Sequence, residues 1–494
     1  MSALILAIDA GTTGVTVQLV DASGHVVGRG YSEFEQHFPQ PGWVEHDPEQ
    51  IWQAVRASGK LALDEAGVSG SAVTAVGITN QRETVVLWDR QTLVAPRRAI
   101  VWQDRRTTDV LNEPKFATVG ERVRELTGLP LDPYFSSSKL LWIKRNEPQV
   151  WKQVESGQTC IGTIDSYLVA RLTGGKSHIT DASNASRTQL MNLETGSWDD
   201  WLLDLFEVPA IALPKVVSNW GELAVCEPTE FLGVTAPVTG MAGDQQAALF
   251  GQLALEPGGT KCTYGTGAFL LQNTGNEKVL TDPRLLATVA WQAPDGKLTY
   301  ALEGSVFIAG AAIQWLRDGL KLITTAPEVN ALASRVPDSG GVFFVPALSG
   351  LGVPFWDPNA RGAFFGITRG TTNAHFARAA IDALAFQVQA LVDAMALVSH
   401  SELSTLRVDG GAAASDLLLQ AQADVLGIVV ERPENLNTTG MGAAYLAGLG
   451  AGVWQSPGKL ARFSGGTERF EPRTDRSADY ERWLRAVAAA QSWN

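Results

Sequence analysis

The sequence predicts an α/β protein built from two related domains that face one cleft. The chain has 494 residues, more than the roughly 100–200 residues of one ordinary domain. An apolar run at residues 4–9 leads into a turn rich in glycine and threonine, "DAGTTG", and a similar turn, "YGTG", recurs at residues 264–267 between two β-prone runs. Internal similarity of this kind predicts two domains of similar architecture.

The composition is that of a globular protein, and it narrows the classes of partner. Hydrophobic residues make up 45% of the chain and charged residues 18%, which is typical of globular enzymes. The formal net charge of −13 disfavours binding to nucleic acid or to an anionic membrane, because the long-range field repels phosphate groups. No nucleic-acid partner is expected, and any bound phosphate must be held by local contacts.

The sequence predicts a cytoplasmic location. Cys160, Cys226 and Cys262 lie far apart and form no CxxC pair, which disfavours a disulfide framework or a zinc site. The N-terminal apolar run is too short for a secretory signal, and no stretch approaches ~20 uninterrupted apolar residues. We therefore expect neither a targeting segment nor an integral membrane span.

The first half of the chain predicts a hairpin and a following strand. Residues 4–9 are expected to form a buried strand, and the alternating apolar residues 15–19 a second strand before the turn at 21–24. These two strands place the glycine-threonine turn at the tip of a β-hairpin. Another strand is expected at 73–80, and it ends in the polar cluster Asn80-Gln81-Arg82-Glu83.

The second half predicts further strands and a long helix. Alternation at 287–292 indicates a strand, and a third glycine turn at 406–416 leaves a strand and enters a helix near Ser415. Helical periodicity is clearest at 376–398, where one face carries Ala380, Leu384, Val388, Leu391 and Met395. The segment "EPGG" interrupts the pattern near 250–258, so we expect an N-terminal domain over residues 1–252 and a C-terminal domain over residues 253–494.

The first glycine-threonine turn has the chemistry of a phosphate-binding loop. Gly11 and Gly14 allow a tight turn and close approach of a ligand, while the amides and hydroxyls of Thr12 and Thr13 offer donors for phosphate oxygens. Asp9, at the end of the strand, is placed to orient the waters of a Mg²⁺ ion. The alternative is a simple hairpin turn whose aspartate is satisfied by amides. Neither a P-loop nor a GxGxxG dinucleotide motif is present.

The segment "GDQQAALFGQ", residues 243–252, offers a candidate catalytic base. Asp244 precedes an apolar run, and a carboxylate in this place can accept the proton of a hydroxyl that attacks a phosphoryl group. The alternative is a helix N-cap, for which aspartate is strongly favoured.

Two groups of residues are candidates for contact with a small polyhydroxylated substrate. Arg82 and Glu83 supply a paired donor and acceptor, although a surface ion pair is the common role of adjacent charges. Trp102, Tyr134 and Phe269 offer flat walls for a carbon skeleton, although most aromatic side chains pack in cores. The six histidines show no metal-ligand spacing.

In combination these segments resemble the FGGY carbohydrate kinases, and among them the glycerol kinases. The similarity runs from about residue 4 to about residue 455. It is carried by "GITNQRET", "AIVWQDRRT", "DPYFSSSKLLWI", "GTIDSYL", "TDASNASRT", "GDQQAALFGQ", "YGTGAF", "ALEGSVFIAGAAIQWLRD", "GLGVPFWDPNARG" and "RVDGGA", with the longer patterns "YFSSSKLLWIKRN" and "GAFFGITRGTTNAHFARAAID".

The resemblance implies an actin-like ATPase fold, in which two ribonuclease-H-like domains flank a deep nucleotide cleft. It implies that Asp244 is the catalytic base, that Asp9 and Asp244 lie near Mg²⁺, and that glycerol is the substrate and ATP the cofactor. The glycerol contacts implied are Arg82, Glu83, Trp102, Tyr134, Asp244, Gln245 and Phe269. The nucleotide contacts implied are Gly11, Thr12, Thr13, Thr266, Gly267, Gly310, Gln314, Gly411 and Ser415.

The chain departs from the family pattern at the first turn and at one loop. Ala10, Gly14 and Thr16 stand where many glycerol kinases have Gln, Ser and Arg, and Ser415 stands where Asn is common. The missing arginine removes a positive charge expected near the ATP phosphates. Residues 227–240 lack the glycine-rich, arginine-containing loop linked to inhibition by fructose 1,6-bisphosphate and the histidine that is phosphorylated in some homologues, so we expect neither form of regulation.

The sequence as a whole predicts ATP-dependent phosphorylation of glycerol to sn-glycerol 3-phosphate, the first step of glycerol catabolism. One alternative is an FGGY kinase of another polyol or of a ketose, such as erythritol or a pentulose. Another is a nucleotide- or polyol-binding sensor without turnover. The resemblance also implies a homodimer or homotetramer.

Overall fold

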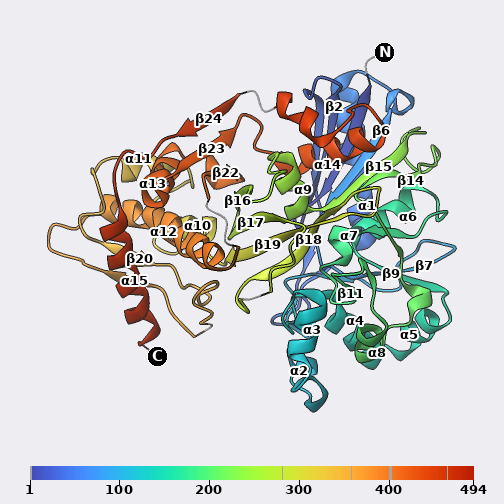
Figure 1. Ribbon diagram of the computed structural model, residues 1–494, viewed down its shortest axis with the longest axis horizontal. Coiled ribbons are helices and arrows are strands. Elements are labelled where there is room, and N and C mark those ends of the chain that lie inside the picture. Colours follow the sequence, from blue (N-terminus) through green and yellow to red (C-terminus); the bar gives the residue numbers. More distant parts are fainter. Residues whose placement is uncertain (1–2, 281, 358, 400–402, 464–465, 494) are drawn as a thin grey trace.

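The computed structural model describes residues 3–280, 282–357, 359–399, 403–463 and 466–493 (Figure 1). Two large sheets dominate it. The first has the strand order β14 (Trp220–Val225), β15 (Pro237–Gly243), β6 (Ala75–Asn80), β1 (Leu4–Ala10), β2 (Gly14–Asp21) and β3 (Val26–Glu33). The second has the order β18 (Leu286–Gln292), β19 (Leu298–Val306), β17 (Ala268–Gly275), β16 (Thr260–Tyr264), β22 (Thr405–Asp409), β23 (Val429–Pro433) and β24 (Thr467–Phe470).

The two sheets share one topology. In the first, β1 pairs antiparallel with β2 and parallel with β6, and β6 pairs parallel with β15. In the second, β16 pairs antiparallel with β17 and parallel with β22, and β22 pairs parallel with β23. The prediction of two related α/β domains is therefore confirmed, and so are both hairpins with glycine-threonine turns at their tips.

Two helices lie between the sheets and hold them together (Figure 1). Helix α9 (Asp244–Gly251) follows the first sheet, and α14 (Thr438–Gly450) from the second half of the chain packs back on strands β1, β6 and β15. They approach so closely that a Cβ at Gly442 would lie 1.8 Å from the carbonyl oxygen of Ala247. Only glycine permits this contact. Helix α14 belongs to the second half of the chain but packs on the first sheet, so the two halves of the chain do not separate cleanly in space. The domain boundary expected between residues 252 and 253 therefore stays a prediction.

Two further predicted strands and the predicted long helix are confirmed. The strand expected at 73–80 is β6, the one at 287–292 is β18, and the long helix is α12 (Asn373–Ser399). The outer helices are α1 (Pro48–Ala66), α10 (Gly310–Asp318), α11 (Glu328–Ala333), α13 (Asp416–Leu426) and α15 (Ser477–Gln491), and a small hairpin pairs β20 (Phe343–Val345) with β21 (Ala363–Phe365).

Among the described helices, α12 has the length and apolar composition to cross a membrane. However, 67% of its most apolar window is buried in the fold, where Leu384, Val388 and Leu391 join the core of the second domain. We interpret α12 as a core helix.

A smaller subdomain is inserted between β6 and β15 (teal and green, lower right of Figure 1). Its core joins the faces of α4, α5 and α8. Its helices are α2 (Thr108–Leu111), α3 (Gly120–Thr127), α4 (Ser136–Asn146), α5 (Pro148–Glu155), α6 (Ile164–Leu172), α7 (Ala182–Ala185) and α8 (Asp200–Phe206). Short strands complete the chain: β4 (Gln36–His37), β5 (Glu45–His46), β7 (Val86–Asp89), β8 (Ala99–Ile100), β9 (Thr159–Gly162), β10 (Ile179–Asp181), β11 (Met191–Asn192), β12 (Ser197–Trp198) and β13 (Lys215–Val217).

Candidate active site

Asp244 lies at the junction between the first sheet and the helices that connect the sheets. Strand β15 ends at Gly243, which occupies the N-cap position, and Asp244 is the first residue of α9. Its carboxylate lies 3.1 Å from Nε of Arg82, and its side chain is 29% exposed. The capping alternative is therefore wrong: Asp244 is already inside the helix, and its carboxylate pairs with an arginine.

Arg82, just beyond the end of β6, is the centre of a buried ion network. Its Nη1 lies 2.6 Å and its Nη2 3.1 Å from the two carboxylate oxygens of Glu303 on β19. The surface ion-pair alternative is wrong, because Arg82 is 3% exposed and Glu83 only 1%. Arg82 instead forms a bidentate pair that joins the first sheet to the second.

A second arginine completes this network. Arg187, from the inserted subdomain, places Nε 2.7 Å from Oε1 of Glu83 and Nη2 3.1 Å from Oε1 of Glu303. The sequence analysis assigned no role to Arg187 or Glu303. The sequence does contain a sign of this pairing: Glu303 lies inside the apolar stretch "LTYALEGSV" of β19, and a charged residue in such a strand needs a buried counter-charge. We name Arg82, Glu83, Arg187 and Glu303 the charge cluster.

The arginines of the charge cluster favour the ionised form of the carboxylates beside them. Burial alone would raise the pKa of Glu303, but Arg187 and Arg82 hold it at about 2. Burial raises the pKa of Asp244, and the positive charges of Arg82 and Lys261 oppose this rise. Arg82 thus stabilises the ionised carboxylate of Asp244, which is the form that accepts a proton.

Asp9 and Asp244 form a pair of carboxylates whose like charges interact. The pKa of Asp9 is raised to about 7, first by burial and then by the negative charge of Asp244. A divalent cation would relieve this repulsion, and carboxylate oxygens are the ligands that Mg²⁺ prefers. Over the described ranges no group of three or more His, Cys, Asp or Glu side chains is arranged to hold a metal. The donor set therefore fits a Mg²⁺ that takes most of its ligands from phosphate and water.

Two predicted aromatic residues form one wall of the site. The rings of Trp102 and Tyr134 meet edge to face, with centroids 5.5 Å apart. Trp102 also donates from Nε1 to Oγ1 of Thr12 at 3.0 Å, which ties this wall to the first phosphate turn. Lys139 fixes the loop of Tyr134, because its buried Nζ donates to the carbonyl oxygens of Tyr134 and Phe135 at 2.9 and 3.2 Å.

The second sheet brings Lys261, Gln245 and Phe269 to the same region. Lys261 is fully buried on β16, and its Nζ donates to Oε1 of Gln245 and, at 2.9 Å, to Oγ1 of Thr263. Phe269 is half-buried on β17, opposite Thr263. Burial lowers the pKa of Lys261, against the opposing effect of Asp409. Lys261, a cation beside the candidate base, is not among the residues predicted from the sequence.

Each of the two predicted phosphate turns is closed by a backbone hydrogen bond between glycines. The amide of Gly11 donates to the carbonyl oxygen of Gly14 at 3.0 Å, and that of Gly265 donates to Gly267 at 2.9 Å. Thr13 and Thr266 are exposed at the two tips. The side chain of Tyr31 leaves room only for glycine at residue 14, because a Cβ there would lie 2.7 Å from the hydroxyl oxygen of Tyr31.

The remaining predicted nucleotide residues lie after the strands β19 and β22 of the second sheet. Gly310 begins α10 and donates to the carbonyl oxygen of Gly265 at 3.0 Å, so it lies against the second turn. Gln314 is exposed one turn further along α10. Beyond β22, Gly411 is exposed, and Ser415 caps α13 by accepting from the amide of Leu418 at 3.1 Å. Ser415 therefore has a structural role of its own.

The architecture and these residues match a known family. The N-terminal domain of the FGGY family of carbohydrate kinases matches residues 4–251, and its C-terminal domain matches residues 260–451. The chain belongs to the FGGY family of carbohydrate kinases. The family predicted from the sequence motifs is therefore confirmed.

Two full-length relatives about 51% identical to this chain are named glycerol kinase. A glycerol kinase of Myxococcus xanthus is 51% identical over 490 residues, 98% of this chain and 99% of the relative, and one of Deinococcus radiodurans is 51% identical over 492 residues, 99% and 98%. The Plasmodium falciparum glycerol kinase with ADP superposes with a TM-score of 0.91 at 33% identity, covering 99% of this chain and 98% of that one. A gluconate kinase of Lactobacillus acidophilus, at 22% identity and a TM-score of 0.87 over 100% and 99% of the chains, shares the fold.

Proposed function

We propose that this protein transfers the γ-phosphoryl group of ATP to glycerol, giving sn-glycerol 3-phosphate. One observation carries the proposal. The side chains of Arg82, Glu83 and Glu303 are no more than 2% exposed, whereas Asp244, held by Arg82, is 29% exposed. Asp244 is thus the most accessible of these four groups, and its carboxylate is held by a buried ion network. Relatives about 51% identical over nearly the whole chain are named glycerol kinase, which supports glycerol as the substrate.

In this proposal Asp244 accepts the proton of the terminal hydroxyl of glycerol as its oxygen attacks the γ-phosphorus. Arg82, Glu83, Tyr134 and Gln245 form hydrogen bonds with the hydroxyl groups, and Trp102 covers the carbon chain. Phe269 contributes to the same apolar wall. Because glycerol carries no charge, selectivity rests on pairing each hydroxyl with a placed donor or acceptor.

The phosphates of ATP lie between the two glycine-threonine turns, where Thr12, Thr13, Thr266 and Gly267 supply donors. Gly11, Gly310, Gln314, Gly411 and Ser415 are proposed to border the nucleotide. Asp9 and Asp244 would hold Mg²⁺, which neutralises charge on the phosphates when bound. Lys261 adds positive charge beside the base.

The test is ADP release from MgATP with glycerol, erythritol, xylulose, ribulose and water alone. Saturable release with glycerol at a kcat/KM at least about tenfold above that with each other compound supports the proposal. A preference for a ketose or for erythritol would keep the kinase and change its substrate. Binding of ATP without turnover on any compound would instead favour a sensor.

A further inference from the structure

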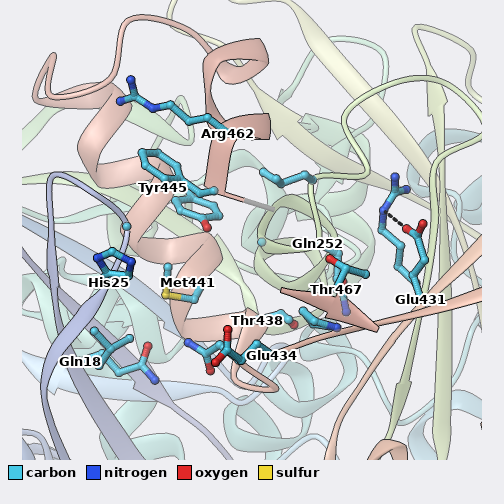
Figure 2. Close-up of a pocket in the computed structure, with 18 of the residues that line it drawn as sticks. Gln18, His25, Gln252, Glu431, Glu434, Thr438, Met441, Tyr445, Arg462 and Thr467 are labelled. Carbon is cyan, nitrogen blue, oxygen red and sulfur yellow. Dashed lines mark ion pairs between the residues drawn. The ribbon is translucent and has the colours of Figure 1, made fainter. Parts of the chain in front are cut away.

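A large cavity lies at the opposite end of α9 from Asp244. Its volume is about 1050 Å³, within the range of small-molecule sites. Its walls come from both halves of the chain (Figure 2). The first half contributes β2, β3, the turn between them and the end of α9, and the second half contributes β22, β23, β24, residues 434–435 and 462–463, and the N-terminal half of α14. None of the residues proposed above for glycerol, ATP or Mg²⁺ lines it.

A buried amide in this cavity lacks a partner. Gln18 on β2 is 2% exposed, and its Oε1 has no hydrogen-bond partner among the described residues. Figure 2 shows its amide pointing away from β2 toward the side of the cavity where Glu434 and Thr438 lie. A buried acceptor without a partner is costly. The cavity therefore offers a place for a ligand that carries a hydroxyl or amine donor.

The cavity also carries an excess of positive charge. Arg29, Arg407, Arg462 and Arg469 line it against two carboxylates, Glu431 and Glu434. Glu431 forms ion pairs with two of these arginines: its Oε2 lies 3.7 Å from Nε of Arg407, and its Oε1 lies 3.6 Å from Nη1 of Arg469. Within the described part of the chain, no carboxylate lies at ion-pair distance from the side chain of Arg29. Arginine is suited to bidentate contact with phosphate.

Strand register places Arg29 and Gln18 together. Arg29 on β3 is directly opposite Gln18 on β2, and Gln18 is opposite Ala7 on β1. Cross-strand partners have side chains on the same face of a sheet. An anion at Arg29 is therefore adjacent to the unpartnered amide of Gln18, so that a single ligand can satisfy both.

A flat apolar surface completes the cavity. The rings of Tyr445 and Phe463 stack at 6.0 Å with an angle of 16° between their planes, and Met441 lies one turn of α14 before Tyr445. We propose that this cavity binds a phosphorylated, hydroxylated small molecule of the sugar-phosphate class. Its phosphate contacts Arg29, a hydroxyl donates to Gln18, and its carbon skeleton packs against Tyr445.

The cavity is connected to the active site through one rigid element. Helix α9 has eight residues from Asp244 to Gly251, or roughly 12 Å at 1.5 Å per residue. Gly251, Gln252 and Leu253 line the cavity. A ligand there contacts the end of the helix whose first residue is the proposed catalytic base.

The test is isothermal titration calorimetry of the full chain with glucose 6-phosphate, glucose and inorganic phosphate, each with and without saturating ADP and glycerol. We expect glucose 6-phosphate to bind once per chain in both conditions, glucose not to bind, and inorganic phosphate to bind at least about tenfold more weakly. Both Arg29→Gln and Gln18→Leu should weaken glucose 6-phosphate at least about tenfold, the loss of one charged or buried hydrogen bond. Arg485→Gln, an exposed change on α15, is the matched control.

Three results would overturn the inference: no heat with glucose 6-phosphate, displacement of it by ADP and glycerol, or equal binding by the wild type and Arg29→Gln. Arg29 is exposed, so its variant is expected to fold even if Gln18→Leu does not. Because the cavity shares no residue with the proposed active site, loss of this binding leaves the glycerol kinase proposal untouched. Failure of that proposal equally leaves this one testable.

Discussion

Replacing Glu303 by Gln should destabilise the fold by about 3 kcal/mol at pH 7. Glu303 is 1% exposed and accepts from two arginines through three contacts of 2.6 to 3.1 Å. Its pKa falls from 4.5 to about 2, and each pH unit corresponds to about 1.36 kcal/mol. The neutral amide keeps the shape but leaves two buried arginines with less negative charge.

The pH dependence has a definite sign. A carboxyl whose pKa is lowered in the folded state contributes stability that is fully present above pH 4.5 and is lost as the pH falls toward 2. The difference between the wild type and Glu303→Gln should therefore be largest above pH 5 and shrink below it. Glu222→Gln, an exposed change on β14, should shift stability by no more than about 0.5 kcal/mol.

Urea unfolding at pH 7, 5 and 3.5, followed by circular dichroism, measures these differences. The reasoning fails if Glu303→Gln costs no more than Glu222→Gln at pH 7. It also fails if the cost stays constant between pH 7 and pH 3.5, because the ionised carboxylate would then not be the source of the stability.

Three further changes test other contacts. Lys139→Met removes the buried donors to the loop before α4 and should raise the KM for glycerol at least about tenfold with a smaller change in kcat; an unchanged KM would show that the loop holds its position without them. Trp102→Phe removes the hydrogen bond to Thr12 and should weaken the binding of MgATP by about 1 kcal/mol, measured through the KM for MgATP. An unchanged KM would show that this hydrogen bond does not position the first phosphate turn. Gly442→Ala places a Cβ 1.8 Å from the carbonyl oxygen of Ala247 and should lower the melting temperature by more than about 5 °C in calorimetry; a Tm equal to the wild type would mean that the two central helices can separate freely.

Much of the fold could be predicted because its signals are local. Two short hairpins with matching turns, and apolar runs of the right period, predicted two related domains. The crossing of α14 onto the first sheet could not be predicted, because nothing within residues 438–450 indicates which sheet it covers. Its contact with α9 depends on Gly251 and Gly442, which are far apart in sequence.

The candidate active site, like the fold, could be predicted only where its signals are local in the sequence. Asp244, Arg82 and Trp102 stand in segments with recognisable composition, and the structure brings all three to the junction of the sheets. Glu303 and Arg187 were missed because their roles arise only when distant segments meet, although a charge inside a buried strand is a warning that a partner exists. The surface ion-pair alternative was wrong because Arg82 and Glu83 are buried, which the local sequence does not give. The capping alternative was wrong because α9 begins one residue earlier than that alternative requires.

The role of Asp244 as the base of a glycerol kinase is best tested by replacing its carboxylate with an amide. Glycerol-dependent ADP release is compared between the wild type and Asp244→Asn, with ADP binding measured on both. The account predicts a loss of at least about 10²-fold in kcat for the variant, with ADP binding within about threefold of the wild type. A variant that retains most of its turnover on glycerol would contradict the assignment of Asp244.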